Sequence, residues 1–384
     1  MKKDSTGRKV AKPVQGERKQ TELELPIGGC LAAASGLTVG LDLGDRASNY
    51  CVLDEKAEVV ARGAVSTDRA ALQEVFGKLP PSGVALEVGT HSPWVSRLLE
   101  ELGHEVIVAN ARQVQLITRS SRKNDRRDAE FLARLARADR KLLAPVRHRG
   151  AEAQADLMGV RVRAQLVELR TQAINAARGF AKSYGMRLAK CDADNLERKH
   201  AAALPTPVRD HIEHLLKMVE ELTREIAACD EELEKLERRR YGTETARLKQ
   251  VSGVGTITAL TFVLTLEDPH RFQRSREVGC YVGLRPQSKQ SGDSEPEMRV
   301  SKEGDVYLRN LLVECGQYIL SQRGPDTDLK RWGLRIAAKG KKKAKRRAVV
   351  AVARKLAVLL HRLWVSGERY EPHRSSATRQ KAAA

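Results

Sequence analysis

Aromatic residues and long apolar runs are scarce in this chain of 384 residues. Phe, Trp and Tyr make up only 4% of it, although 41% of the residues are hydrophobic. A core built mainly from Leu, Val and Ala favours helices. Because no signal peptide and no apolar segment of membrane-spanning length is present, we expect a cytoplasmic protein that does not engage a membrane.

Cysteine is present but lacks the spacing of a metal site. No two of the six cysteines form a CxxC pair, and none shares a ligand spacing with histidine: Cys30, Cys51, Cys191, Cys229, Cys280 and Cys315. This scatter argues against a zinc site. In a cytoplasmic protein we expect the thiols to stay reduced.

Positive charge is the strongest feature of the composition, and it is concentrated at the two ends. The formal net charge is +20, of which residues 1–20 carry +5 and residues 330–384 carry +15. Residues 111–150 add a local +8, which acidic stretches elsewhere offset. This pattern indicates a polyanionic partner, while solvated faces and disordered tails are the alternative for the ends alone.

Short apolar segments with turn residues between them predict a mixed α/β domain. Three successive strands are expected over 37–44, 48–54 and 58–65, followed by a helix over 67–79. A strand (83–89), a helix (92–102) and another strand (105–110) come next. Three strands followed by alternating helix and strand units are the order of an RNase H-like (RuvC-like) α/β fold.

Beyond Asn110 the apolar spacing becomes helical. Apolar residues recur at alternating steps of three and four from Leu157 to Ile174, and again from Ile212 to Leu236. Two such helices predict an antiparallel hairpin or an intermolecular coiled coil, with a solvent-bridging helix pair as the alternative. Two further helices are expected in the last third of the chain, over 306–320 and 344–364.

These patterns predict an α/β domain, a helical coiled-coil arm and a mainly α C-terminal domain. The expected parts are a flexible basic leader (1–35), the RuvC-like domain (36–150), the arm (151–240), the C-terminal domain (241–366) and a disordered tail (367–384).

Two acids lie in otherwise apolar strands, where a carboxylate without a partner is costly to bury. Asp42 is at the centre of TVGLDLG, and Glu87 interrupts VALEVG. Asp125 and Asp128 are three residues apart at the start of a predicted helix and therefore share a face. Four acids from separate elements would hold two divalent cations by oxygen ligation.

Each acid also has an ordinary structural explanation. Asp42 would cap a turn, Glu87 would form a salt bridge, and Asp125 would cap a helix. Taken jointly, the four acids favour a metal site. Three cations close to Asp125 and Asp128 are expected to bind phosphates: Lys123, Arg126 and Arg127.

The segment VSGVGTITAL resembles a helix-hairpin-helix DNA-binding turn. Gly253 and Gly255 would let backbone N–H groups approach a phosphate at the N-terminus of the following helix. A tight turn between two helices explains the same glycines equally well.

Longer blocks of the sequence resemble a known family. The segments VGLDLGDRASNYCVLD, ALEVGTHSPW and NARQVQLITRSSRKNDRRDAEFLARL have the order and distances of the DEDD catalytic domain of the insertion-sequence-110 family, the RNA-guided bridge recombinases. The segments VSGVGTITALTFVLTLEDPHRFQRSREVGCYVGLRP, QSG and VSKEGDVYLRNLLVE resemble the transposase domain of that family. The resemblance covers about residues 37–365.

The resemblance implies which residues carry the chemistry. The four acids of the family fall on Asp42, Glu87, Asp125 and Asp128, and its nucleophilic serine falls on Ser291.

Two positions depart from the family pattern. The family often has Thr or Ser where this chain has Asn124, and two serines where this chain has Gln290 and Ser291. The second departure leaves three other serines of the same region as alternative nucleophiles: Ser288, Ser294 and Ser301.

The resemblance also implies a mechanism and partners. A serine hydroxyl attacks DNA and forms a covalent phosphoserine intermediate, assisted by a two-metal Mg²⁺ site in which Mn²⁺ is able to substitute. The implied partners are donor and target DNA, a non-coding guide (bridge) RNA and further copies of the chain, as a dimer or tetramer. Lys302 and Arg309 are expected to contact nucleic acid.

Three other functions compete with transposition. A sugar-kinase-like or actin-like ATPase would need a second phosphate loop that the sequence lacks. A Holliday-junction-type nuclease, acting by metal-activated water, would explain the acids and the basic segments but would need no second domain with the SG and SKEGDVYLR blocks. A nucleic-acid scaffold would leave Asp42 and Glu87 unexplained. We therefore rank the transposase first, the nuclease second and the ATPase third.

Overall fold

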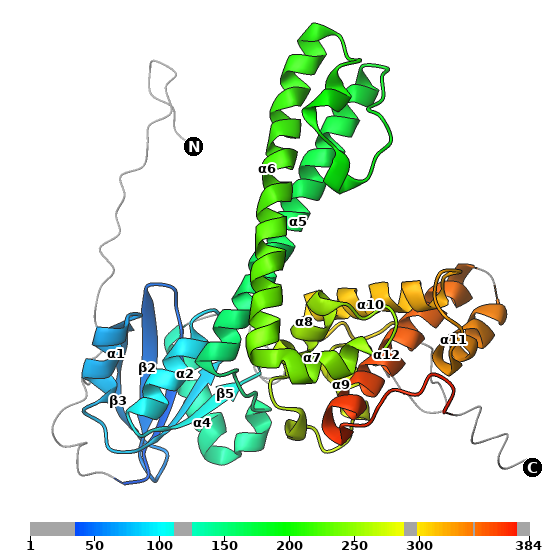
Figure 1. Cartoon of the computed structure of the whole chain (residues 1–384). Coiled ribbons are helices and arrows are strands. Elements are labelled where there is room, and N and C mark those ends of the chain that lie inside the picture. The colour runs from blue at the N-terminus through cyan, green and yellow to red at the C-terminus, as the bar shows by residue number, and fades with distance from the viewer. Residues whose placement is uncertain (1–34, 111–124, 288–297, 341, 375–384) are drawn as a thin grey trace, which may run out of the picture. The chain divides into compact units, whose positions relative to one another are not determined.

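The computed structural model describes residues 35–110, 125–287, 298–340 and 342–374. The chain divides into two compact units, Met1–Arg149 and Gly150–Ala384. In Figure 1 the first unit contains the strands, in blue and cyan, and the second is built from helices, in green to red. No described helix is long and apolar enough to cross a bilayer.

A five-stranded mixed sheet is the frame of the first unit. Its strands are β1 (Thr38–Asp42), β2 (Ala47–Leu53), β3 (Val59–Ser66), β4 (Gly83–Glu87) and β5 (Glu105–Ala109), in the spatial order β3-β2-β1-β4-β5. Strand β2 is antiparallel to β1 and β3, while β4 is parallel to β1 and β5. The five predicted strands are confirmed, and the mixed sheet is consistent with an RNase H-like fold.

Alternating side chains divide this sheet into two faces. One face packs against α1 (Arg69–Phe76) and α2 (Ser92–Glu101), because Leu41 and Leu86 share a core with residues of both helices. The other face packs against α4 (Asp125–Ala138): Cys51 and Leu53 contact Ala129 and Ala133, and Ala85 lies in a cluster with Leu132. A short 3-10 turn (Arg140–Leu143) follows α4.

Two long helices, α5 (Ala151–Ser183) and α6 (Thr206–Leu236), form an antiparallel hairpin, seen in green in Figure 1. At one end Leu157 of α5 packs with Leu233 of α6, and at the other Ile174 packs with Leu216. The connection contains two 3-10 turns (Ala193–Asn195 and Arg198–Ala201). The predicted helical spacing therefore forms a hairpin within the chain, one of the arrangements expected from the sequence.

A π-helical turn (Glu237–Tyr241) joins the hairpin to the C-terminal helices. Glu237 is only 5% exposed and pairs with Lys249, at 2.6 Å between Oε1 and Nζ. The helices that follow are α7 (Gly242–Lys249), α8 (Thr256–Leu266), α9 (Arg276–Tyr281), α10 (Val306–Leu320), α11 (Asp328–Ala338) and α12 (Lys342–Ser366), with a 3-10 turn at Pro269–Arg271.

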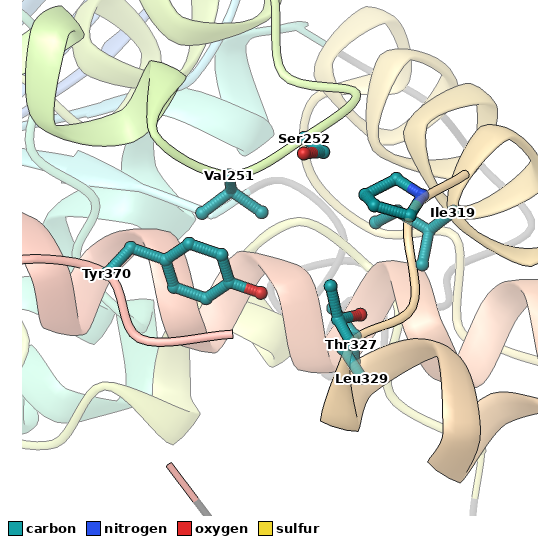
Figure 2. Close-up of a pocket in the computed structure, with 7 residues that line it drawn as sticks. Val251, Ser252, Ile319, Thr327, Leu329 and Tyr370 are labelled. Atoms are coloured by element: carbon teal, nitrogen blue, oxygen red, sulfur yellow. The ribbon is translucent and has the colours of Figure 1, made fainter. Parts of the chain in front are cut away.

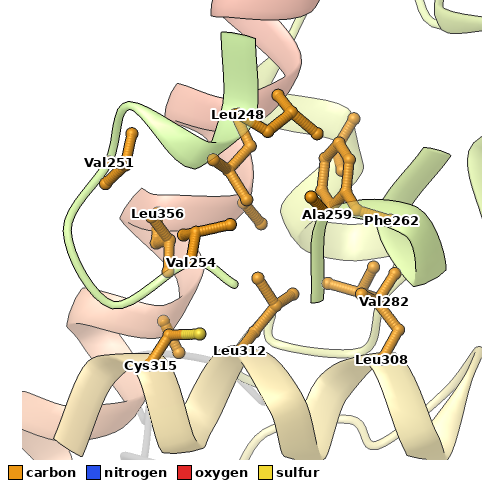
Figure 3. Packing of buried hydrophobic residues seen from close by; sticks show 14 of the residues in the cluster. Leu248, Val251, Val254, Ala259, Phe262, Val282, Leu308, Leu312, Cys315 and Leu356 are labelled. Atoms are coloured by element: carbon orange, nitrogen blue, oxygen red, sulfur yellow. The ribbon is translucent and has the colours of Figure 1, made fainter. Parts of the chain in front are cut away.

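Residues distant in the sequence make up one core in this C-terminal region. Figure 3 shows Leu248 of α7, Phe262 of α8, Leu312 of α10 and Leu356 of α12 packed together. The helices predicted over 306–320 and 344–364 are confirmed, whereas α11 was not predicted. Helix α12 begins at Lys342, two residues before the predicted start at Ala344.

The described end of the chain folds back onto this core. The Tyr370 N–H donates to Gln250 Oε1 at 2.9 Å, and the Asp328 N–H donates to the Pro372 carbonyl at 2.9 Å. Figure 2 shows Tyr370 lining a small pocket with Val251 and Leu329. The segment 367–374 is thus attached through Tyr370 and Pro372, although its residues other than Tyr370 are exposed. The disordered tail expected over 367–384 remains a prediction, and residues 375–384 lie outside the described part.

Candidate active site

Two of the predicted acids end neighbouring parallel strands. Asp42 is the last residue of β1, and Glu87 is the last residue of β4. The two strands are in register, with Leu41 opposite Leu86, so the acids are next to one another at the carboxyl end of the sheet. Both residues are partly buried and have interaction partners in the described structure.

The alternation of the strands also fixes the face on which these acids lie. Leu41 and Leu86 are buried on the α1 and α2 side. The residues that follow them, Asp42 and Glu87, therefore lie on the opposite face, which α4 covers.

Helix α4 runs antiparallel to β1. A Cβ atom on Gly40 would lie 1.9 Å from the Ala129 carbonyl oxygen, so the helix backbone contacts the strand where a side chain is absent. At the other end of the helix, Arg137 Nη1 donates to the Gly36 carbonyl at 2.8 Å. The N-terminus of α4 is consequently at the same end of the sheet as Asp42.

The remaining two acids belong to that N-terminus. Asp125 is the first residue of α4, and Asp128 is exposed directly before the buried Ala129. Arg127 is exposed beside them, while Lys123 lies outside the described residues. The backbone therefore brings all four acid positions towards one end of the sheet, although the side chains of Asp125 and Arg126 are not described.

Oxygen donors of this kind suit a divalent cation such as Mg²⁺. Among the side chains that the structure describes, no three His, Cys, Asp or Glu groups gather closely enough to hold a metal ion. The set of four acids includes Asp125, whose side chain is outside that search. A metal site at this end of the sheet accordingly remains a prediction.

The loops that follow the two strand acids are tied to each other. His91 Nε2 lies 3.4 Å from Asp45 Oδ1, and Trp94 Nε1 donates to His91 Nδ1 at 3.1 Å. Because an indole N–H only donates, Nδ1 of neutral His91 accepts, and the imidazole proton is on Nε2, facing Asp45. Asp45 follows Asp42 by three residues and His91 follows Glu87 by four, so this contact spans the site.

A buried serine holds the turn after Glu87. Ser92 Oγ donates to the Gly89 carbonyl at 2.8 Å and accepts from the Gly89 N–H at 2.9 Å. His148 Nε2 lies 2.9 Å from the same hydroxyl, and Ser92 is fully buried. Burial, with Arg97 and Arg149 nearby, lowers the pKa of His148, which keeps the imidazole neutral at pH 7.

The proposed nucleophile lies in a loop of the second unit whose two ends are paired. Pro286 and Val300 form an antiparallel bridge, and the Gln287 N–H donates to the Arg299 carbonyl at 2.8 Å. Ser291, with Ser288 and Ser294, lies between these ends and outside the described residues. The structure therefore describes the base of this loop but not its serine.

Ser301, the fourth candidate, is part of that base. Its N–H donates to the Arg285 carbonyl at 2.8 Å, and its hydroxyl accepts from the Glu303 N–H at 3.4 Å. The next residue, Lys302, has a left-handed φ of +57° and is exposed, so its ammonium group is available to a ligand.

Arg309 joins both chain segments at the base of the loop. Its Nη1 donates to the Val282 carbonyl at 3.1 Å and to the Glu303 carbonyl at 3.0 Å, and the residue is 8% exposed. Gly283 and Gly304 allow this closeness, since a Cβ on either would lie 1.9 Å from a carbonyl oxygen of the other segment. This placement gives Arg309 a positioning role at the base of the loop, and its contact with nucleic acid remains a prediction.

The glycine turn joins α7 to α8. Gly253 has a φ of +92°, and a Cβ there would lie 2.6 Å from Tyr318 Cδ1. Gly255 precedes the first residue of α8. Val254 is buried in the core shown in Figure 3. The turn is therefore closely packed between two helices, and its approach to a phosphate remains a prediction.

Sequence reasoning did not find the side chains that support the acids. His91 and Ser92 follow Glu87 closely, but a histidine and a serine at the start of a helix carry no distinctive pattern. His148 is 56 residues from Ser92 in the chain, so only the fold brings them together.

Comparisons with known proteins place this chain among transposases. A transposase family model of the IS110 DEDD type matches residues 39–186, and the model of the IS116/IS110/IS902 transposase family matches residues 245–331. A putative transposase of Sinorhizobium fredii, y4pF/y4sB, is 32% identical over 309 residues, which are 79% of this chain and 78% of the relative.

Two relatives are named after insertion sequences. The transposase for IS1111A of Coxiella burnetii is 29% identical over 88% of this chain and 92% of its own length. The transposase for IS1328 of Yersinia enterocolitica is 28% identical over 74% of this chain and 84% of its own length. The DEDD type of the first family model indicates divalent-metal dependence in general. This chain belongs to the IS110 family of insertion-sequence transposases, enzymes that act on DNA.

Proposed function

We propose that this transposase cuts and exchanges DNA strands through a covalent link to Ser291, at a metal site made by Asp42, Glu87, Asp125 and Asp128. The observation that supports the metal site is the common position of four acids from β1, β4 and α4 at one end of the sheet.

The four acids would supply oxygen ligands for two Mg²⁺ ions, for which Mn²⁺ would substitute. Bound there, the ions stabilise negative charge on the attacking and leaving oxygens of a phosphodiester. The protein contributes the rigid spacing. Strand register fixes Asp42 against Glu87, and the contact of Gly40 with Ala129 fixes the start of α4 above them.

In the first step, the Ser291 hydroxyl attacks the phosphorus of one DNA strand. An Oγ–P bond forms, the bond from phosphorus to the leaving sugar oxygen breaks, and the serine proton is given up while the leaving oxygen gains one. A hydroxyl of a second strand then attacks the phosphoserine, restores a phosphodiester and frees Ser291. No water is consumed, so the phosphodiester energy is conserved.

Several groups are proposed to hold nucleic acid around the site. The cations beside the acids, Lys123, Arg126 and Arg127, would contact phosphates, and Lys302 would do so at the base of the serine loop. The turn at Gly253 and Gly255 would act as a helix-hairpin-helix contact to the backbone of DNA. Contacts to phosphates do not distinguish one base sequence from another, which is consistent with target choice by a non-coding bridge RNA.

Assembly is the other part of the proposal. The acids and the serine belong to different compact units, and the α5–α6 hairpin begins the second of them. We propose a dimer or tetramer in which the hairpin mediates contact and one copy supplies acids to the serine of another. Mixing Asp42→Ala protein with Ser291→Ala protein then restores activity, and no restoration in verified mixed oligomers would contradict shared sites.

The decisive experiment is a search for the covalent intermediate. Wild-type protein is expected to yield an SDS-resistant protein–DNA adduct with Mg²⁺, and Ser291→Ala to yield none. The variants Ser288→Ala, Ser294→Ala and Ser301→Ala are matched controls, and mass spectrometry locates the nucleotide remnant. An adduct on another of these serines corrects the residue but keeps the mechanism. If DNA strands are cleaved but no variant forms an adduct, the serine mechanism is contradicted. The result would then favour a Holliday-junction-type nuclease that uses a metal-activated water.

A further inference from the structure

The two ends of α12 use their cations in different ways. Towards its C-terminus, Lys355 Nζ lies 4.4 Å from the centre of the Trp332 ring, and Arg362 pairs with Glu368 at 2.9 Å. The stem of Arg354 packs against Gly279, where a Cβ would lie 3.0 Å from Cγ. These three cations therefore have partners within the fold.

Six cations near the junction of α11 and α12 are exposed instead. They are Arg335, Lys339, Lys342, Lys343, Lys345 and Arg346, and we call them the α11–α12 basic surface. None of the six forms an ion pair with a residue that the structure describes. Residues 332–367 contain eleven Lys and Arg and no Asp or Glu, so nearby positions in the sequence offer no counter-charge.

This arrangement opposes folding of the helix that carries it. Lys342 and Arg346 are four residues apart on α12, and like charges at that spacing destabilise a helix. Cations in the first turns of α12 also face the positive end of the helix dipole. A bound polyanion would relieve both effects.

We propose that the α11–α12 basic surface binds the phosphate backbone of nucleic acid. A duplex carries one charge per about 1.7 Å of its axis, so several phosphates fall within the roughly 6 Å that α12 rises between Lys342 and Arg346. A surface made mostly of Lys provides point charges without base recognition, which suits a backbone contact. This surface is separate from the residues proposed above for catalysis, and its occupancy requires neither metal nor strand exchange.

The test compares two variants of the full chain with equal loss of charge. The first replaces four cations of the surface, Lys342→Gln, Lys343→Gln, Lys345→Gln and Arg346→Gln. The control replaces four exposed cations of the hairpin region that also form no ion pair with a described residue, Lys182→Gln, Arg187→Gln, Lys190→Gln and Lys217→Gln. Affinity is measured without divalent metal over a range of salt, for a DNA duplex, an RNA duplex of the same length and phosphatidylserine vesicles.

We expect the surface variant to bind nucleic acid at least about tenfold more weakly at low salt, with a slope of log K against log salt reduced by about 0.9 for each lost DNA phosphate contact. The duplex that shows the larger loss identifies DNA or RNA as the occupant. An unchanged slope for both duplexes, an equal loss in the control variant, or a loss confined to the vesicles would each overturn the proposal.

A second measurement covers the case in which the fourfold variant fails to fold. Acetylation of Lys342, Lys343 and Lys345 in the wild-type protein is mapped by mass spectrometry with and without each duplex. Protection of these lysines, greater than that of Lys182 and Lys190, supports the proposal, and equal labelling in the presence of saturating duplex contradicts it. Since neither measurement needs cleavage, a failed surface and a failed serine mechanism give different results.

Discussion

The acid site and the serine loop are held by different kinds of contact. Asp42 and Glu87 end strands whose register and packing fix them, and α4 touches β1 through bare backbone at Gly40. The described base of the serine loop is held by a bridge between Pro286 and Val300 and by the two hydrogen bonds of Arg309. Strand register and the helix contact therefore set the acid positions directly, whereas the described contacts of the serine loop set its two ends.

Replacing any one of the four acids should have the largest effect on strand exchange. We expect Asp42→Ala, Glu87→Ala, Asp125→Ala or Asp128→Ala each to lower strand exchange by about a thousandfold or more while the fold persists, because a metal ligand is lost and mutual repulsion of the acids is relieved. Glu58→Gln removes an exposed acid of the same unit and should leave activity near normal. Near-normal exchange by one of the four variants would remove that residue from the site.

Adding a side chain at the contact between β1 and α4 should have the next largest effect. In Gly40→Val the new side chain meets the Ala129 carbonyl, so we expect a loss of about 3 kcal/mol in the unfolding free energy of the first unit. Activity should fall with it, because the start of α4 moves away from Asp42. Gly89→Ala is the control, since a Cβ there meets no atom within 4 Å. Equal unfolding midpoints in urea for Gly40→Val and wild type would contradict the close contact.

Loosening the base of the serine loop should have a moderate effect of a different kind. Arg309→Met removes the two hydrogen bonds that join Val282 to Glu303. We expect about a tenfold drop in adduct formation, because these bonds are lost while the bridge between Pro286 and Val300 still pairs the ends of the loop and the core retains the apolar stem. The Mg²⁺ concentration for half-maximal activity should not change. A shift in that concentration would show that Arg309 acts on the metal site instead.

The smallest expected effect concerns pH and the turn after Glu87. Burial lowers the pKa of His148, so folding favours its neutral form, and the unfolded chain binds more protons below about pH 6.5. The neutral imidazole of His148 therefore contributes fully to the stability of the fold above that pH. This contribution declines as the pH falls towards the pKa of His148 in the folded protein. His148→Gln should flatten part of this decline, and Ser92→Ala should weaken the turn by about 1 kcal/mol.

Hydrogen exchange of the amides in β4 and α2 measures both changes. His104, whose pKa burial also lowers, stays in the His148→Gln variant and should account for the pH dependence that persists in the first unit. An unaltered pH dependence in that variant would mean that His148 is not held neutral by the fold.

Much of the fold followed from the sequence, because the central strands are short apolar runs bounded by turn residues and α10 and α12 have broad apolar stripes. Asp42 and Glu87 stood out as charges within apolar strands. Helix α11 was missed because only Leu329 and Gly333 are buried along it, which leaves too narrow a stripe to recognise. The positioning role of Arg309 was not predicted, because a sequence shows that a residue is cationic but not that two carbonyl groups accept its hydrogen bonds.

The antiparallel hairpin makes the length of this protein adjustable. Both of its ends return to one place, since Leu157 and Leu233 pack with Leu260 and Leu264 of α8. Seven residues are close to two helical turns, so removing or adding seven from both α5 and α6 would change the reach by about 10 Å while keeping nearly the same faces in contact. The length of the hairpin thus sets the distance from α8 to the hairpin tip. A graded set of lengths would report how far from α8 its tip must extend for transposition to proceed.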